Sequence, residues 1–319
     1  MRISAHASAT HAGRKRRRNE DRFVVRPPLF GVADGMGGAQ AGELASRLAA
    51  AVLEDDETDG AGPEQRVVAL IEEANRRVFD RASGDAAASG MGTTMTVALV
   101  DEDRVTIGHV GDSRAYRLRA GVIEQLTDDH SLVAELVRSG KLSPEEADHH
   151  PQRSVITRVL GTDPDIDVDV FSVEGHTGDV YMICSDGLTT MVDDERIAAV
   201  LVEHGDDLDG AARALVATAN RVGGEDNITV VCFALGEDDP TEETQVLDTP
   251  TAEQNLAEQD DEDTLSGLDG PAPLGTSTSA EAEREGESAG RSLRSLAFAF
   301  AFGLAAVLVL LVLLLSDVF

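Results

Sequence analysis

A run of twenty residues without a charge, residues 296–315, is the feature that most limits what this chain can fold into. At a rise of about 1.5 Å per residue, a helix of this length spans about 30 Å, which is the thickness of the hydrocarbon core of a bilayer. We therefore predict a transmembrane helix here in preference to a buried core helix. If this run lies in the membrane, the hydrophobic core of any soluble domain has to come from the residues that precede it.

The stretch immediately before the apolar run is acidic and poor in aliphatic residues. Residues 237–290 contain seventeen acidic residues and a single basic residue, Arg284. Such a composition buries too little apolar surface to offset the entropy lost on ordering. We expect residues 237–295 to form a disordered linker.

The charges around the apolar run predict its orientation in the membrane. Arg291 and Arg294 precede it, whereas only Asp317 follows it. The positive-inside rule then places the N-terminal domain in the cytoplasm and leaves residues 316–319 as a short extracytoplasmic tail. Residues 1–21 lack the apolar run of a signal peptide. We expect a single-pass protein of the cell membrane.

Residues 1–236 remain for one soluble domain. The whole chain has 27 basic and 59 acidic residues, a net charge of −32, which disfavours binding to nucleic acid because phosphates need a basic face. Aromatic residues make up 3% and tryptophan is missing, so a base-stacking platform is not expected. Two cysteines are too few for a disulfide scaffold or a cysteine-based zinc site.

Hydrophobic periodicity predicts short strands alternating with pairs of helices. Strands are expected at residues 23–26, 29–33, 93–100, 104–110, 114–119, 122–125, 168–173, 180–184 and 227–234. Helices are expected at residues 41–53, 63–81, 131–139, 194–203 and 208–222, with an irregular stretch at 141–166. Successive hairpins with inserted helices indicate antiparallel sheets covered by helices, and not a repeated βαβ unit.

Three apolar strands of this prediction adjoin an aspartate that lies close to a glycine. Asp34 and Asp186 follow the strands at 29–33 and 180–184, and Asp226 precedes the strand at 227–234. A single Asp-Gly pair is usually a turn. Three such corners, if they converge, need a cation to offset their repulsion, and glycine lets the backbone approach it. Oxygen ligands select Mg²⁺ or Mn²⁺ over zinc.

The order of seven short motifs resembles the bacterial form of the metal-dependent protein phosphatases of the 2C type. These motifs are Asn19-Glu20-Asp21, Asp34-Gly35-Met36-Gly37-Gly38, Met91-Gly92-Thr93-Thr94, Gly111-Asp112-Ser113-Arg114, Asp129-His130, Ser185-Asp186-Gly187-Leu188 and Asp226-Asn227. The resemblance covers residues 13–235. It implies an α+β fold in which two antiparallel β-sheets pack as a sandwich with helices on both outer faces, a four-layer αββα arrangement.

The resemblance also implies an activity, the hydrolysis of phosphoserine and phosphothreonine in proteins with two tightly bound Mn²⁺ or Mg²⁺ ions. Asp34 is expected to bridge the two ions, and the Gly35 carbonyl to ligate one of them. Asp186 and Asp226 are expected to complete the site of the other ion. Phosphorylated proteins would be the substrates, a Ser/Thr kinase the opposing partner, and the enzyme a monomer.

Other acidic residues have supporting roles in this resemblance. Asp21, together with Glu20, is expected to act through water molecules that the ions hold. Asp129 matches the position of a third, weaker ion, with Asp112 as a further contact. The residues themselves leave an alternative for Asp129, which could instead cap the helix expected at 131–139.

The basic run at residues 14–18 contains the expected phosphate ligand. Arg16 stands three residues before Asn19, the position that binds phosphate in the family, and a guanidinium fork suits a phosphate bidentately. The neighbouring Lys15 and Arg17 are expected to be solvated.

One position departs from the family pattern. Met36 stands where some members carry a histidine that can protonate the leaving group, so the proton has to come from water or from another residue such as His130. A histidine beside acids is also often a hydrogen-bonded structural residue. The irregular stretch at 131–166 corresponds to the mobile flap of bacterial relatives, where substrate choice could reside.

Two other functions remain open from the residues alone. The first is a catalytically silent regulatory or binding protein with a phosphatase fold, although Asp34, Asp186, Asp226 and Arg16 are all retained. The second makes the acidic linker a cation sponge or a docking arm, although its charges lack the spacing of a calcium loop.

Overall fold

The computed structural model describes residues 1–37, 40–56 and 61–237. The predicted transmembrane helix at 296–315, the tail at 316–319 and nearly all of the predicted linker lie outside these residues. In the part of the chain that is described, no helix is long and apolar enough to span a bilayer.

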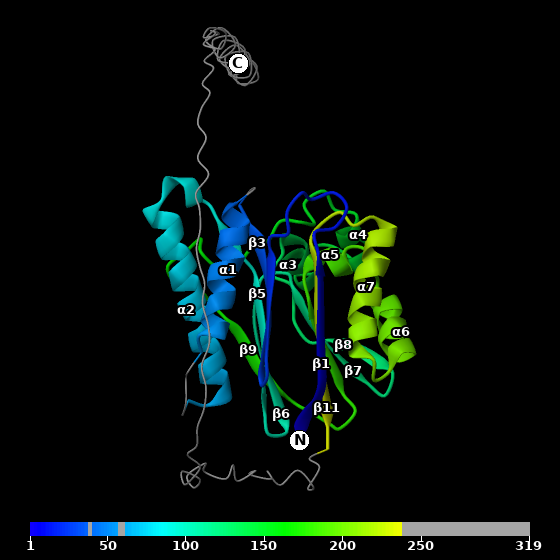
Figure 1. The fold of residues 1–319 in the computed structure, drawn as a ribbon. Helices are drawn as coiled ribbons and strands as arrows, with labels where there is room; N and C mark the ends of the chain where they lie inside the picture. Colours follow the sequence, from blue (N-terminus) through cyan, green and yellow to red (C-terminus); the bar gives the residue numbers. More distant parts are fainter. Residues whose placement is uncertain (38–39, 57–60, 238–319) are drawn as a thin grey trace, which may run out of the picture. The chain divides into compact units, whose positions relative to one another are not determined.

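Two antiparallel sheets form the centre of the domain (Figure 1). The first has the strand order β1 (Arg2–His11), β11 (Ile228–Gly236), β10 (Val180–Cys184), β7 (Arg114–Arg119) and β8 (Val122–Gln125). The second has the order β2 (Asp21–Arg26), β3 (Leu29–Met36), β5 (Met95–Asp101), β6 (Arg104–Val110) and β9 (Asp169–Glu174), with the short β4 (Gly92–Thr93) paired to β3.

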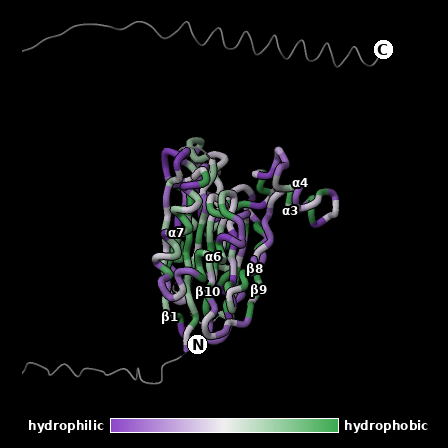
Figure 2. Tube along the Cα trace, turned by 90° about the vertical axis from the view of Figure 1, so that its right-hand side faces the viewer, coloured by the Kyte–Doolittle hydropathy of each residue, from purple (hydrophilic) through white to green (hydrophobic). Residues whose placement is uncertain are grey.

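Helices cover both outer faces of this sandwich, which confirms the predicted αββα layering. The second sheet is covered by α1 (Ala41–Glu54) and α2 (Pro63–Gly84), which is followed by a short 3₁₀ turn (Ala86–Ala88). The first sheet is covered by α5 (Asp186–Thr189), α6 (Asp194–His204) and α7 (Leu208–Val222). Figure 2 shows α3 (Leu132–Arg138) and α4 (Pro144–Asp148) projecting from the side of the sandwich.

Aromatic rings fill the layer between the two sheets. Phe233 of β11 stacks on Phe30 of β3 with the ring centroids 4.3 Å apart, and on Tyr181 of β10 at 5.1 Å. All three side chains are at most 1% exposed. This contact joins the sheets along their middle strands, so the ends of β3, β10 and β11 are held at fixed positions.

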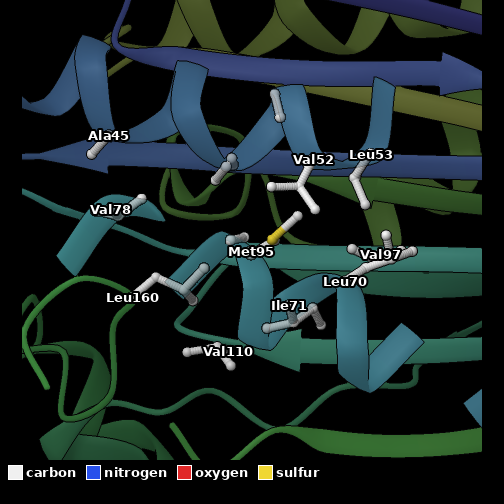
Figure 3. Packing of buried hydrophobic residues seen from close by; sticks show 14 of the residues in the cluster. Ala45, Val52, Leu53, Leu70, Ile71, Val78, Met95, Val97, Val110 and Leu160 are labelled. Atoms are coloured by element: carbon white, nitrogen blue, oxygen red, sulfur yellow. The ribbon is translucent and has the colours of Figure 1, made fainter. Parts of the chain in front are cut away.

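A second apolar layer lies between the second sheet and its helices (Figure 3). Val52 and Leu53 of α1 and Ile71 of α2 pack with Met95 and Val97 of β5. The buried positions of this cluster recur at helical spacing on α1 and α2 and alternate on β5, as expected for elements that each bury one face. This packing holds the end of α1 and the middle of α2 against β5.

The sequence prediction missed β1, α4, α5 and the 3₁₀ turn at Ala86–Ala88, and it did not separate β4 from β5. β1 is an edge strand whose inward positions are occupied mainly by alanine, a weak strand former, and its backbone pairs with β11 more than 200 residues away. α4 and α5 are a single turn or little more, too short for a periodic signal. The remaining predicted strands and helices agree with the structure to within three residues at each end.

Candidate metal centre and phosphate site

The β2–β3 hairpin sets two carboxyl groups side by side. Asp21 and Asp34 are direct partners in this antiparallel pair, so their side chains point to the same face. The backbone N–H of Asp34 donates to the Thr94 hydroxyl at 3.0 Å, which ties the end of β3 to the segment before β5. Asp21 is 2% exposed, and its carboxyl contacts that of Asp34.

The other sheet brings further aspartates to the same place. Asp186 begins α5, two residues after the end of β10, and its carboxyl also contacts Asp34. Asp226 lies two residues before β11, the neighbour of β10. Asp112, in the link between β6 and β7, adds a charge that acts on both Asp34 and Asp186. The predicted convergence of Asp34, Asp186 and Asp226 is therefore present.

Burial and mutual repulsion raise the pKa values of these carboxyl groups. Burial, followed by the charges of Asp21 and Asp186, raises the pKa of Asp34 well above its usual value. Burial and then the charges of Asp112 and Asp226 raise the pKa of Asp186 to about 8. Burial likewise raises the pKa of Asp21 to about 6. Several carboxylates can be ionised here together only if a cation lies among them.

Unpaired oxygens support a cation at this cluster. Asp21 Oδ1 and Asp186 Oδ1 are buried without a hydrogen-bond partner among the described residues, an arrangement that is costly unless something else binds them. The other oxygen of Asp21 is fixed by the hydroxyls of Ser185 at 2.8 Å and Thr229 at 2.6 Å. An all-oxygen donor set fits Mg²⁺ or Mn²⁺.

The side chains of this cluster are not arranged as a complete set of metal ligands. Across residues 1–37, 40–56 and 61–237, no group of three or more His, Cys, Asp or Glu side chains is placed so that it could hold a metal ion. The assignment of a metal therefore rests on the buried like charges and the unpaired oxygens, and the predicted roles of individual ligands stay predictions.

The glycines beside the aspartates permit close packing of backbone on backbone. A Cβ atom at Gly35 would lie 2.1 Å from the carbonyl oxygen of Gly42 in α1, and one at Gly187 would lie 1.9 Å from that of Asn227. The sequence suggested that these glycines make room for a ligand. In the structure they bring α1 against β3 and α5 against the chain entering β11, and this packing fixes where Asp34 and Asp186 lie.

Arg16 lies at the rim of the cluster. Its guanidinium Nη2 donates to Asp226 Oδ2 at 2.7 Å, and its side chain is 57% exposed. The hydrogen bond to Asp226, opposed by partial burial, raises the pKa of Arg16, so it stays charged. Within the basic run, Arg14 instead donates to the Asn220 carbonyl and Arg18 pairs with Glu43. The structure thus brings the predicted phosphate ligand to the predicted metal ligands.

Asn227 holds the loop that carries Arg16, a role that the sequence reasoning did not assign. Its side-chain N–H groups donate to the carbonyls of Ala12 at 3.0 Å and Arg18 at 2.8 Å, and its Oδ1 accepts from the N–H of Glu20 at 2.7 Å. Asn227 is 4% exposed. The only signal in the sequence was its place in the Asp226-Asn227 motif.

Asp129 is held by an arginine. Both of its carboxylate oxygens accept hydrogen bonds from Arg114, at 2.9 and 2.8 Å. Burial and then the charge of Asp129 raise the pKa of the neighbouring Asp112. The alternative that Asp129 caps a helix is wrong, because Ser131 caps α3 by accepting from the N–H of Ala134. An ion at Asp129 would have to compete with Arg114 for the same two oxygens, and this third site stays a prediction.

The substitution Asp129→Asn separates these two roles. Because Asn cannot replace a bidentate carboxylate and the Arg114 side chain is only 27% exposed, we expect a lower melting temperature. If Asp129 also ligates a third ion, turnover will fall and the Mn²⁺ concentration needed for half-maximal activity will rise. Asp80→Asn, which makes the same change in the exposed pair with Arg76, is the control and should change neither. An unchanged Mn²⁺ requirement in Asp129→Asn would assign Asp129 to the ion pair alone.

His130 is a structural residue and not a free proton donor. Its Nδ1 accepts from the N–H of Gly111 at 3.1 Å, and its Nε2 lies 3.1 Å from Asp169 and 3.2 Å from Arg158. Burial lowers the pKa of this imidazole. With both ring nitrogens engaged and Met36 unable to donate, the sequence's suggestion that His130 protonates the leaving group finds no support.

A four-layer αββα sandwich with an all-oxygen acidic centre and an arginine at its rim defines the class of metal-dependent phosphatases. Residues 11–222 match the family described as protein phosphatase 2C. The Listeria innocua protein named serine/threonine phosphatase stp is 40% identical over 233 residues, which cover 70% of this chain and 92% of that protein. Mycobacterium tuberculosis PstP is 39% identical over 231 residues, which cover 72% of this chain and 44% of that protein.

Solved structures agree with these similarities. The crystal structure of the Mycobacterium tuberculosis serine/threonine phosphatase PstP/Ppp has a TM-score of 0.69 at 37% identity, covering 73% of this chain and 99% of that chain. The catalytic domain of PstP in complex with two manganese ions has a TM-score of 0.67 at 35% identity, with coverages of 73% and 98%. The chain belongs to the protein phosphatase 2C family, which confirms the resemblance and the fold.

Proposed function

We propose that this chain hydrolyses phosphoserine and phosphothreonine esters in proteins and depends on Mn²⁺ or Mg²⁺. The observation that carries the proposal is the convergence of Asp34 with Asp21 and Asp186 in a buried cluster whose unpaired oxygens point to a cation, beside the exposed guanidinium of Arg16. The relatives named serine/threonine phosphatases support the same reaction.

The chain's own residues prepare the site for this reaction. Two divalent ions held by Asp34, Asp186 and Asp226 would supply an activated water and positive charge for the phosphoryl oxygens. Ser185 and Thr229 fix one oxygen of Asp21, so the free oxygen keeps its position. The guanidinium of Arg16 has donors left beyond its bond to Asp226 and can bind the phosphate in a fork.

The test is a phosphate-release assay with the full-length protein on a phosphothreonine peptide. We expect turnover with Mn²⁺ or Mg²⁺ and its loss with a chelator. Undiminished turnover in excess chelator would exclude the metal-dependent mechanism. Binding of both Mn²⁺ and the phosphopeptide without phosphate release would support the alternative, a silent regulatory protein.

We further propose that the enzyme opposes a Ser/Thr protein kinase. A phosphatase of this kind consumes the phosphoesters that such a kinase forms, so the two activities have to share substrates. Comparing the phosphoproteins of cells with and without the active enzyme tests this proposal. Phosphoserine and phosphothreonine sites should gain occupancy when the enzyme is lost, while phosphotyrosine sites should not.

We also propose that residues 296–315 anchor the enzyme in the cell membrane with the catalytic domain in the cytoplasm. The support is the uncharged run of twenty residues and the two arginines that precede it. Deleting residues 296–319 is expected to move the protein from the membrane pellet to the supernatant, with unchanged turnover of a small phosphoester. Full-length protein already in the supernatant after ultracentrifugation would contradict the anchor. Digestion of the domain by protease added outside intact cells would contradict the orientation.

A further inference from the structure

A groove of about 310 Å³ lies where the start of α1 meets the end of α2. Figure 1 shows these two helix ends at the same end of the domain as the end of β3. The groove is lined by three arginines, Arg18, Arg47 and Arg81, and by two acidic residues, Glu43 and Asp85. Basic residues gathered in one groove stand out on a chain with a net charge of −32.

The groove lies directly beside the acidic centre. Gly42, between two residues that line the groove, is packed so closely that a Cβ atom there would lie 2.1 Å from Glu20 Oε2 and 2.8 Å from the carbonyl oxygen of Gly35. Arg18 enters the groove from the same loop that carries Arg16 to Asp226. A peptide whose phosphorylated residue is at the centre can therefore place a nearby side chain in the groove, because each extended residue spans about 3.3–3.6 Å.

Both acidic residues of the groove already pair with arginines, so one of the three arginines in the groove is left without an acidic partner among the residues that the structure describes. Glu43 Oε1 accepts from Arg22 at 2.9 Å, and its Oε2 lies 3.6 Å from Arg18. Asp85 pairs with Arg81 at 2.8 Å and also accepts from the N–H of Ala87. Arg47 forms no ion pair with any residue in the described part of the chain. Its exposed guanidinium keeps all its donors free for an anion.

We propose that this groove is a substrate subsite for a second anionic group, a phosphate or a carboxylate, carried a few residues away from the phosphorylated residue that is hydrolysed. The proposal rests on the proposed phosphatase function. Arg47 supplies the free fork, while Arg18 and Arg81 offset the charges of Glu43 and Asp85, so the lining keeps a positive charge. The enzyme would thereby favour multiply phosphorylated or acidic segments over neutral ones.

The test compares phosphothreonine peptides that differ at one further position. The further position is moved in turn from three residues before to three residues after the phosphothreonine. At each place it is occupied by alanine, glutamate or phosphoserine, which gives three matched sets of peptides. We expect kcat/KM to rise about fivefold with glutamate and more with phosphoserine in one register, because a charge-assisted bond strengthens with the charge of the anion. Arg47→Ala should abolish this preference and leave turnover of para-nitrophenyl phosphate unchanged. The control is Arg196→Ala, which removes an exposed arginine from α6 on the opposite outer face.

Binding of fluorescent versions of the same peptides, measured by anisotropy, does not require turnover. The subsite is supported, even if catalysis fails, when the unaltered protein binds the acidic peptides more tightly than the alanine peptides. Arg47→Ala should remove this difference in binding, and Arg196→Ala should keep it. Equal binding and equal kcat/KM across all peptides would overturn the subsite while leaving the phosphatase intact. A preference only for phosphoserine identifies phosphate as the ligand, whereas equal preference for glutamate identifies any anion. A full-length protein that turns over no phosphoester with Mn²⁺ would instead contradict the proposed function.

Discussion

The substitution Asp34→Asn is expected to lower kcat on the order of a thousandfold, the loss that follows when a metal centre can no longer activate water. Asn keeps the size of the side chain and one oxygen, but it removes the carboxylate on which the charges of both Asp21 and Asp186 act. The hairpin pairing of β2 with β3 uses backbone atoms, so the fold should persist. Turnover of para-nitrophenyl phosphate with Mn²⁺ and a calorimetric Mn²⁺ titration measure the effect.

The control for this substitution is Asp101→Asn, at the exposed end of β5. It makes the same chemical change and should leave both the rate and the Mn²⁺ titration as in the unaltered protein. A fully active Asp34→Asn enzyme would contradict the assignment of the metal centre.

The same variant gives a second readout that does not depend on catalysis. The pKa of Asp34 is raised in the folded state, so the folded protein holds this proton more tightly than the unfolded chain does. Without metal, the contribution of Asp34 to stability is therefore largest below about pH 4, the unfolded pKa, and is lost as the pH rises through the folded pKa. Asp34→Asn removes this titration, so in a chelator it should melt several degrees above the unaltered protein at pH 7 and show a weaker dependence on pH.

Local patterns were enough to predict most of the fold. β5 is a nearly continuous apolar run, β6 alternates apolar and polar residues over most of its length, and short turns separate the strands from β5 to β8. α7 has an apolar stripe bounded by Asp207 and Gly223, so each of these elements is specified by its own residues. β1 is different, because its stability comes from pairing with β11 at the far end of the domain, and no local pattern records that contact.

In the candidate site, too, the residues marked by local patterns could be predicted and those held by remote contacts could not. Asp34 and Asp186 were predictable because each follows an apolar strand, and strand ends collect at the ends of sheets. The residues that hold the site together were not, because their partners are remote in sequence: Thr229 bonds Asp21, and Asn227 bonds the loop at residues 12–20. The ion pair between Arg114 and Asp129 was missed for the same reason, and it alters what a substitution at Asp129 tests.

Arg16→Ala is expected to lower kcat/KM about 100-fold and to raise KM, because the guanidinium fork binds the phosphoryl oxygens both in the bound substrate and as their charge shifts in the transition state. The loss should be as large on para-nitrophenyl phosphate as on a peptide, since the fork binds the phosphate itself. Arg16→Lys keeps the charge but not the fork, so it should restore only part of the activity.

The matched control is Arg17→Ala, which removes the same charge from the next residue of the basic run. Arg17 is exposed, and we expect its loss to be near neutral. Because Arg16 also pairs with Asp226, the Mn²⁺ titration of Arg16→Ala has to be measured beside its kinetics. An unchanged titration with a lower kcat/KM places the defect in phosphate binding, whereas equal kinetic losses at Arg16 and Arg17 would refute the single-residue assignment and favour a diffuse basic patch.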